Sequence, residues 1–179
     1  MQNEIVEILL TEEQIQNRIK ELAAEINKEY AGKNPIFVGV LRGVVVFFSD
    51  FIRQFNDYCQ IDFMCISSYR GANSTGECIM TKDTSLELRN RHVIILEDIF
   101  DTGKSLDFTY NFLMTKKPAS LKIVTLLDKP SRRKPWVTVK PDLVGFTVED
   151  KFVVGYGLDF NEQFRNLPFV AVLNPEDYL

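Results

Sequence analysis

The chain has 179 residues, of which 45% are hydrophobic and 26% are charged, and its formal net charge is −4 at pH 7. This length and apolar content fit one globular domain with a sizeable core and exclude a disordered chain. The acidic balance argues against a protein that binds nucleic acid over its whole surface, although it leaves local basic patches open.

The amino-terminal stretch MQNEIVEILL has acidic residues where a secretory signal would be basic, and its apolar run is short. The densest apolar stretch, Val44 to Phe55, is interrupted by Asp50 and Arg53 well before the roughly 20 apolar residues that a membrane span needs. We therefore expect a cytoplasmic protein that does not enter a membrane.

The first clear element is an amphipathic helix that starts after Thr11. Thr11 and Gln14 form a capping box, and apolar residues repeat at helical spacing from Ile15 up to the glycine at position 32. The next segment, PIFVGVLRG (35–43), predicts a short strand that ends in a glycine turn, and residues 44–55 predict a second helix. The basic unit is therefore a strand, a tight turn and a helix.

The same unit recurs along the chain. Further strands are expected over 61–69, 92–98, 121–128 and 142–150, and a helix over 105–117. This alternation predicts an α/β fold with an open, mainly parallel twisted sheet flanked by helices, whose ligands bind at the carboxyl ends of the strands. The polar segment 70–85 is longer than most connections, which suits a lid, a β-arm or a plain surface loop.

No repeat or linker divides the chain, so residues 1–179 are expected to form a single domain. Its core would span about 11–148, and the chain ends, about 1–10 and 149–179, would form a small hood lobe. The cysteines at 59, 65 and 78 show no Cys-x-x-Cys spacing and are expected to be reduced structural thiols. A catalytic pair with His92, the single histidine, is a weaker alternative because a thiol inside an apolar strand is usually inert.

The stretch LEDIFDTGKSL (96–106) places three carboxylates before a phosphate-binding type of tripeptide, Gly103-Lys104-Ser105. A P-loop needs a glycine five residues before its second glycine, and Asp98 stands there, so that motif is excluded. What remains is an acid-rich turn, with Glu97, Asp98 and Asp101, that leads into a small polar loop.

That loop suits a sugar phosphate. Its amides, the hydroxyls of Thr102 and Ser105 and the amino terminus of the following helix would bind one monophosphate. Glu97 and Asp98 would repel a bare phosphate, but they suit a ligand that also carries hydroxyls and a magnesium ion. A ribose 5-phosphate satisfies both requirements.

Every position of VIILEDIFDTGKS (93–105) resembles the phosphoribosyl-pyrophosphate (PRPP) motif of the phosphoribosyltransferases, so the resemblance implies the type I fold of that family. Further segments are similar to its hypoxanthine-guanine branch in the right order. They are GVLRG (39–43), SSYRGANSTGE (67–77), LLDKPSRRK (126–134) and DKFVVGYGLDFNEQFRNLP (150–168).

The resemblance implies a purine salvage enzyme. It would transfer the 5-phosphoribosyl group from PRPP to hypoxanthine or guanine, giving IMP or GMP and pyrophosphate with inversion at the anomeric carbon. It also implies Mg²⁺ as cofactor, a homodimer or homotetramer, and neither nucleic acid nor membrane as a partner.

The resemblance further implies roles for individual residues, with Asp101 as the general base and acid at the purine N7. The phosphate and ribose would be bound by Glu97, Asp98, Asp101, Thr102, Gly103, Lys104 and Ser105, and the pyrophosphate by Leu41, Arg42, Gly43, Ser68, Tyr69 and Arg165. The purine would be bound by Lys129, Phe152, Val153 and Asp159, and the metal by Glu97, Asp98 and Asp159.

Two of these positions have consequences of their own. The ammonium of Lys129 only donates hydrogen bonds, so it would favour a 6-oxopurine over adenine. Arg42 stands where the family commonly has lysine, and the Leu41–Arg42 peptide is the bond that is often cis in the family.

Three alternatives stay open. The basic run 132–134 is interpreted as a solvated loop rather than a nucleic-acid patch. A regulatory protein that keeps the fold but binds nucleic acid could dispense with Asp101 and Lys129, and this acidic chain retains both. A phosphoribosyltransferase for another base, such as xanthine, would share nearly every residue named above.

Overall fold

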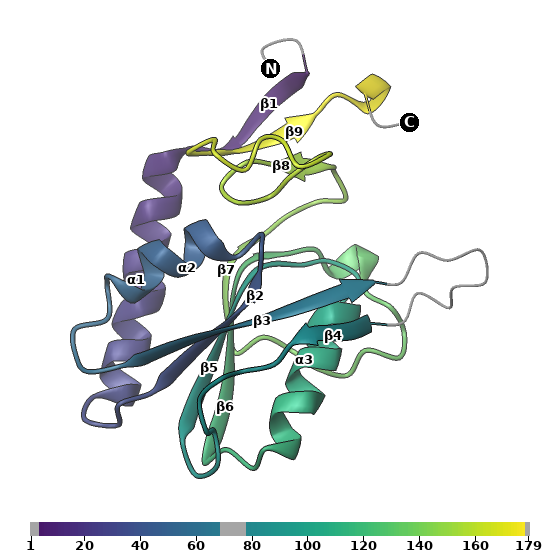
Figure 1. The fold of residues 1–179 in the computed structure, drawn as a ribbon. Helices are drawn as coiled ribbons and strands as arrows, with labels where there is room; N and C mark the ends of the chain where they lie inside the picture. Colours follow the sequence, from purple (N-terminus) through teal and green to yellow (C-terminus); the bar gives the residue numbers. More distant parts are fainter. Residues whose placement is uncertain (1–3, 69–77, 178–179) are drawn as a thin grey trace.

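The computed structural model describes residues 4–68 and 78–177, and the helices and strands predicted between residues 11 and 150 appear in it in the expected order (Figure 1). The strands are β1 (Ile5–Leu10), β2 (Ile36–Leu41), β3 (Gln60–Ser68), β4 (Cys78–Lys82), β5 (His92–Phe100), β6 (Ser120–Asp128), β7 (Leu143–Thr147), β8 (Val153–Val154) and β9 (Val170–Leu173). The helices are α1 (Glu12–Tyr30), α2 (Val45–Ile52) and α3 (Lys104–Thr115), with short 3-10 turns η1 (Pro130–Arg132) and η2 (Pro175–Asp177).

The predicted capping box starts α1. The Thr11 hydroxyl accepts from the Gln14 amide at 3.2 Å, and the Gln14 side chain accepts from the Thr11 amide at 2.8 Å. The apolar face then buries Ile15, Ile19 and other aliphatic residues completely. Each such side chain contributes about 2 kcal/mol of hydrophobic stabilisation, so packing rather than capping holds the helix in place.

The main sheet has six strands in the order β4-β3-β2-β5-β6-β7, all parallel except β4. Alternate residues of the central strands enter two cores, as the period of a strand requires. Phe37 and Ile94 pack with α1 and α2 on one face, whereas Val38 and Ile95 pack with α3 on the other (Figure 1). The predicted α/β fold with a mainly parallel sheet flanked by helices is confirmed.

The predicted end of β5 is wrong. The strand expected to end near Glu97 and Asp98 continues to Phe100, where it still pairs with β6 at Asp128. The ladder continues past the two acids because Glu97 pairs with Thr125, and Ile99 and Phe100 pair with Leu127 and Asp128 on β6. Consecutive residues of a strand point to opposite faces, so the two acids face different sides of the sheet.

The two ends of the chain build a second, smaller sheet in the order β1-β9-β8, and every pair in it is antiparallel. Figure 1 shows this sheet above the six-stranded one. The division into a core over about 11–148 and a hood remains a prediction, although the chain ends do lie together. Within the described part of the chain, no helix is long and apolar enough to cross a membrane.

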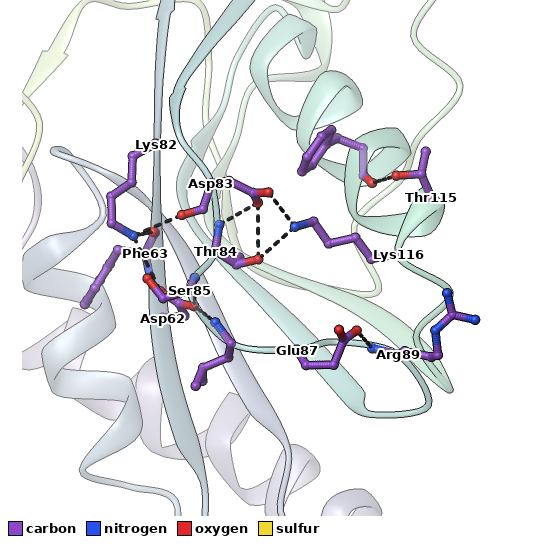
Figure 2. Close-up of polar contacts among 12 residues, drawn as sticks. Asp62, Phe63, Lys82, Asp83, Thr84, Ser85, Glu87, Arg89, Thr115 and Lys116 are labelled. Atoms are coloured by element: carbon purple, nitrogen blue, oxygen red, sulfur yellow. Dashed lines mark hydrogen bonds and ion pairs between the residues drawn. The ribbon is translucent and has the colours of Figure 1, made fainter.

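The edge of the main sheet at β4 is fastened by a polar cluster (Figure 2). The buried Asp62 accepts from the amides of Ser85 and Leu86 at 2.6 and 2.8 Å, and Lys116 at the end of α3 binds Asp83 at 2.6 Å. Because β4 pairs antiparallel with β3, the flanks of the polar segment form a β-arm, and residues 69–77 lie outside the described structure.

Candidate active site

A cavity of about 630 Å³ lies where the carboxyl ends of the parallel strands meet the segment 150–165. This is the edge at which open α/β sheets bind ligands. Many of the predicted site residues line it together: Arg42, Gly43, Asp98, Asp101, Lys129, Phe152, Val153, Asp159 and Arg165.

A smaller cavity of about 90 Å³ adjoins it in the turn between β5 and α3. Predicted phosphate-loop residues line this space: Glu97, Asp101, Thr102, Gly103 and Ser105. Gly103 is the residue before α3, so the free amides at the start of a 12-residue helix face this turn. Asp101 and Ile99 line both cavities and mark where they meet.

Some predicted residues lie elsewhere. Leu41 ends β2 and Lys104 begins α3, and neither is among the residues that line the two cavities. The Leu41–Arg42 peptide is cis, as the resemblance implied. Ser68 is the last residue of β3, and Tyr69 lies outside the described residues.

Glu97 and Asp98 are two consecutive acids near the end of β5. Burial, and then the negative charge of Asp98, raise the pKa of Glu97 well above its usual value. Burial also raises the pKa of Asp98 to about 6, although the Ile99 amide, which donates to its carboxylate at 3.0 Å, acts in the opposite direction. In addition, Glu97 Oε2 is buried and accepts no hydrogen bond. The site therefore favours a proton, a hydroxyl donor or a cation at this point.

This pair should make the ligand-free protein more stable in mild acid. With a native pKa of about 6 for Asp98 and an unfolded value near 4, the native state binds more protons in this window, so stability falls as the pH rises. The penalty at pH 7 is up to about 3 kcal/mol. Urea denaturation should find Asp98→Asn more stable than the unmodified chain at pH 7 and nearly equal to it at pH 4.5.

Asp62 provides the control, because its pKa is lowered in the folded protein whereas that of Asp98 is raised. Amides of Leu86, Phe63 and Ser85 outweigh burial and lower the pKa of Asp62, so its stabilising effect is lost only below about pH 4. Asp62→Asn should therefore destabilise the protein at pH 7. A loss of stability in Asp98→Asn at pH 7 would mean that burial does not govern its carboxylate.

The acidic pair also bears on the magnesium ion that the family resemblance implies. Among residues 4–68 and 78–177, no three Asp, Glu, His or Cys side chains are grouped to hold a metal ion by themselves. The unpartnered Glu97 oxygen and the raised pKa values of both acids nevertheless fit a cation whose remaining ligands come from a bound substrate.

The residues predicted to bind the purine line the larger cavity: Lys129, Phe152, Val153 and Asp159. Lys129 follows β6 and is only 5% exposed, and its amide donates to the Phe100 carbonyl at 3.0 Å. Burial lowers the pKa of Lys129, while the charges of Asp101 and Asp150 oppose this change. Phe152 lies directly before β8 and packs edge-on against Phe160 with ring centres 5.6 Å apart. A buried cationic donor and an aromatic ring therefore line the same space.

The cations predicted for pyrophosphate are already paired within the protein. Arg165 lies 2.8 Å from Asp159, and its other guanidinium nitrogen donates to the Gly157 carbonyl at 2.8 Å. Arg42 pairs with Glu162 at 2.8 Å. A bound pyrophosphate would compete with these carboxylates for the two guanidinium groups.

Glycine is favoured at position 43 because the Asp98 side chain lies very close to its Cα, and not because its φ is positive. A Cβ atom at this position would lie 1.9 Å from Asp98 Oδ2. Any other residue would displace the Asp98 carboxylate, so glycine lets the turn after β2 pack against the end of β5 with that carboxylate in place.

Sequence reasoning missed Arg132. Its Nε lies 3.1 Å from Asp101 Oδ1 without hydrogen-bond geometry, and its Nη1 lies 3.4 Å from Asp150. Arg132 and Asp150 both line the larger cavity. The motif LLDKPSRRK contained the arginine, but a run of three basic residues looks the same on a solvated loop and in a binding site.

The interpretation of this basic run as a solvated loop is also wrong for Arg133. Its side chain is 18% exposed, pairs with Asp128 and lies over the Phe100 ring, 3.0 Å from the ring centre. The aromatic side chain at the end of β5 provides the packing surface that a charge pattern cannot reveal. Arg133 therefore packs against the last residue of β5, directly before the turn that leads to α3.

A mainly parallel α/β sheet with an acidic turn after β5, beside a cavity lined by cations, is the arrangement that the resemblance to phosphoribosyltransferases predicts. The phosphoribosyl transferase domain family matches residues 6–161. A hypoxanthine-guanine phosphoribosyltransferase from Staphylococcus aureus is 48% identical over 179 residues, which cover 99% of each chain.

A crystal structure of a hypoxanthine phosphoribosyltransferase from Staphylococcus aureus superposes with a TM-score of 0.94 at 47% identity, covering 100% of this chain and 97% of the other. A bifunctional TilS/HprT protein from Listeria innocua is 44% identical over 99% of this chain, which spans 27% of that protein's length. The chain belongs to the hypoxanthine-guanine phosphoribosyltransferase family.

Proposed function

We propose that this protein transfers the 5-phosphoribosyl group of PRPP to hypoxanthine or guanine, releasing pyrophosphate and forming IMP or GMP. One observation supports the proposal: the residues proposed for the phosphate, the base and the pyrophosphate line two cavities that share Asp101. The phosphate turn opens on one side of it, while Lys129 and Phe152 line the cavity on the other. Arg42 and Arg165 complete the same cavity, so a sugar, a base and a pyrophosphate would share one space.

The phosphate turn would bind the 5-phosphate through the amides at the start of α3 and the hydroxyls of Thr102 and Ser105. Glu97 and Asp98 would accept hydrogen bonds from the ribose hydroxyls. This contact would give the unpartnered oxygen of Glu97 a hydrogen-bond donor. Arg42 and Arg165 would exchange their carboxylate partners for the pyrophosphate.

Asp101 is proposed to take the proton from the purine N7 as the base bonds to C1 of the sugar. Lys129 would donate to the 6-oxo group, a contact that adenine cannot make because it carries an amino group there. Phe152 would stack on the ring, and the Val153 backbone, at the start of β8, would contact the pyrimidine edge. Stacking tolerates many bases, so the lysine would provide most of the discrimination.

Mg²⁺ is the proposed cofactor, with Glu97, Asp98 and Asp159 as the residues that would hold it. When bound, it would neutralise the charge that develops on the departing pyrophosphate. Asp159 pairs with Arg165 in this structure, so it would have to exchange that partner. A cytoplasmic location and a homodimer or homotetramer remain part of the proposal.

The direct test is to incubate the protein with PRPP, hypoxanthine and Mg²⁺ and to quantify nucleotide and pyrophosphate by chromatography. We expect IMP and pyrophosphate in equal amounts, and no product when a chelator removes the metal. Pyrophosphate without IMP would indicate hydrolysis of PRPP instead of transfer. An equal rate of IMP formation with and without the chelator would contradict the proposed role of Mg²⁺.

A further inference from the structure

Outside both cavities, the carboxylate of Asp50 on α2 joins three parts of the protein. One of its oxygens accepts from the Tyr156 hydroxyl and from the Gln16 side chain on α1, each at 2.6 Å, and the other oxygen pairs with Arg53. Burial alone would raise the pKa of Asp50, but these three hydrogen bonds outweigh it and lower the pKa. Because each donor compensates a largely buried charge, the cluster is fixed in one arrangement.

Tyr156 stands where β8 gives way to the loop that carries Asp159 and Arg165. The residue is 2% exposed and its φ is 51°, a left-handed conformation that a bulky side chain rarely adopts. Its amide donates to the Leu167 carbonyl at 2.9 Å, and the Gly157 amide donates to the Arg165 carbonyl at 2.9 Å. The loop therefore folds back on the residues next to Tyr156.

Gly157 then connects this loop to the turn after β2. A Cβ atom on Gly157 would lie 2.1 Å from the Gly43 carbonyl oxygen, and its φ of 97° also favours glycine. The Gly157 carbonyl accepts from the Arg165 guanidinium at 2.8 Å. The backbone directly after Tyr156 thus contacts both segments proposed to bind pyrophosphate.

We propose that the Tyr156–Asp50 hydrogen bond positions the pyrophosphate half of the site, by holding the loop of Arg165 against the turn of Arg42 and Gly43. The inference rests on the proposed function and extends it to residues outside the cavity. Tyr156 and Asp50 line neither cavity, so they act through the backbone of Gly157 and not on the substrate.

A positioning role differs measurably from a merely structural one. Loss of an ordinary core hydrogen bond lowers stability and leaves the relative affinities for the substrates unchanged. Loss of this hydrogen bond should selectively weaken the binding of PRPP or pyrophosphate, because these are the ligands that would contact both segments. Lys129, the proposed contact of the 6-oxo group, follows β6 and belongs to neither of these two segments.

The test compares Tyr156→Phe with Tyr30→Phe, which removes the hydroxyl of another core tyrosine. Tyr30 is also 2% exposed, but it ends α1 and packs against His92 at the opposite ends of the strands. In Tyr156→Phe, the KM for PRPP and the Kd for magnesium pyrophosphate should rise about 10-fold or more. Its KM for hypoxanthine should stay within about 2-fold, and Tyr30→Phe should change none of these values.

Equal losses for PRPP and hypoxanthine, or a change in the thermal midpoint alone, would overturn the inference. If Tyr156→Phe does not fold, Asp50→Asn, which keeps an acceptor for the tyrosine, should show a weaker form of the same selective loss. If the unmodified protein turns over no PRPP, the proposed function fails, and pyrophosphate calorimetry alone decides the inference. Weaker binding only in Tyr156→Phe then supports it, and equal or absent binding in the unmodified protein and the variant overturns it.

Discussion

Asp101→Asn is expected to lower kcat for hypoxanthine by about 10²- to 10⁴-fold, the range that a lost general acid–base group commonly costs. The amide keeps the size of the carboxylate but cannot take the proton from N7. Asp101 lies where the two cavities meet, so the effect should fall on the chemical step. Calorimetry should still find PRPP bound to the variant, because the phosphate turn and the arginines are intact.

Asp150→Asn is the matched control for this change. Asp150 lines the same cavity and contacts the same arginine, Arg132, at 3.4 Å, but it is more exposed and has no proposed proton to transfer. Its loss should cost less than about 10-fold in kcat, as expected for a partly exposed ion pair. Similar losses in both variants would mean that the acids act through the cations they share, Arg132 and Lys129, and not by proton transfer.

Lys129→Met is expected to lower kcat/KM for hypoxanthine by about 100-fold, because a hydrogen bond from a charged donor to the 6-oxo group is lost. Turnover of adenine should stay the same or rise, so the preference for 6-oxopurines shrinks. Steady-state kinetics with both bases measures this ratio. The low exposure of Lys129, 5%, is the reason to expect a large effect.

Lys151→Met separates this role from a general loss of positive charge. Lys151 lines the same cavity, but it is 37% exposed and pairs with Glu7 at 2.9 Å. Its removal should change the ratio of hypoxanthine to adenine turnover by less than about 3-fold. An unchanged ratio in Lys129→Met would refute the assignment of this lysine to the 6-oxo group.

Local patterns carried most of the fold. The capping box at Thr11, the helical spacing that follows it and the apolar runs of the central strands each depend on neighbours within a few residues. The PRPP motif is also local, so the turn from Glu97 to Ser105 was predictable as a unit. Its exact shape was not, because the length of β5 is set by its pairing with β6.

The rest of the site depends on contacts between distant parts of the chain. Arg42 and Glu162 are 120 residues apart, and Asp50 and Tyr156 are 106 residues apart. No spacing rule links such pairs, because the fold alone brings them together. Arg133 shows the same limit, since it follows η1 and packs against the ring of Phe100 at the end of β5.

The measurement that tests the account most directly is a spectrophotometric assay with PRPP and Mg²⁺ against hypoxanthine, guanine, xanthine and adenine. The account predicts turnover of hypoxanthine and guanine, with adenine inert. Turnover of xanthine alone would assign the pocket to a different base. Binding of PRPP without turnover of any base would contradict the enzymatic account and favour a regulatory protein that keeps the fold.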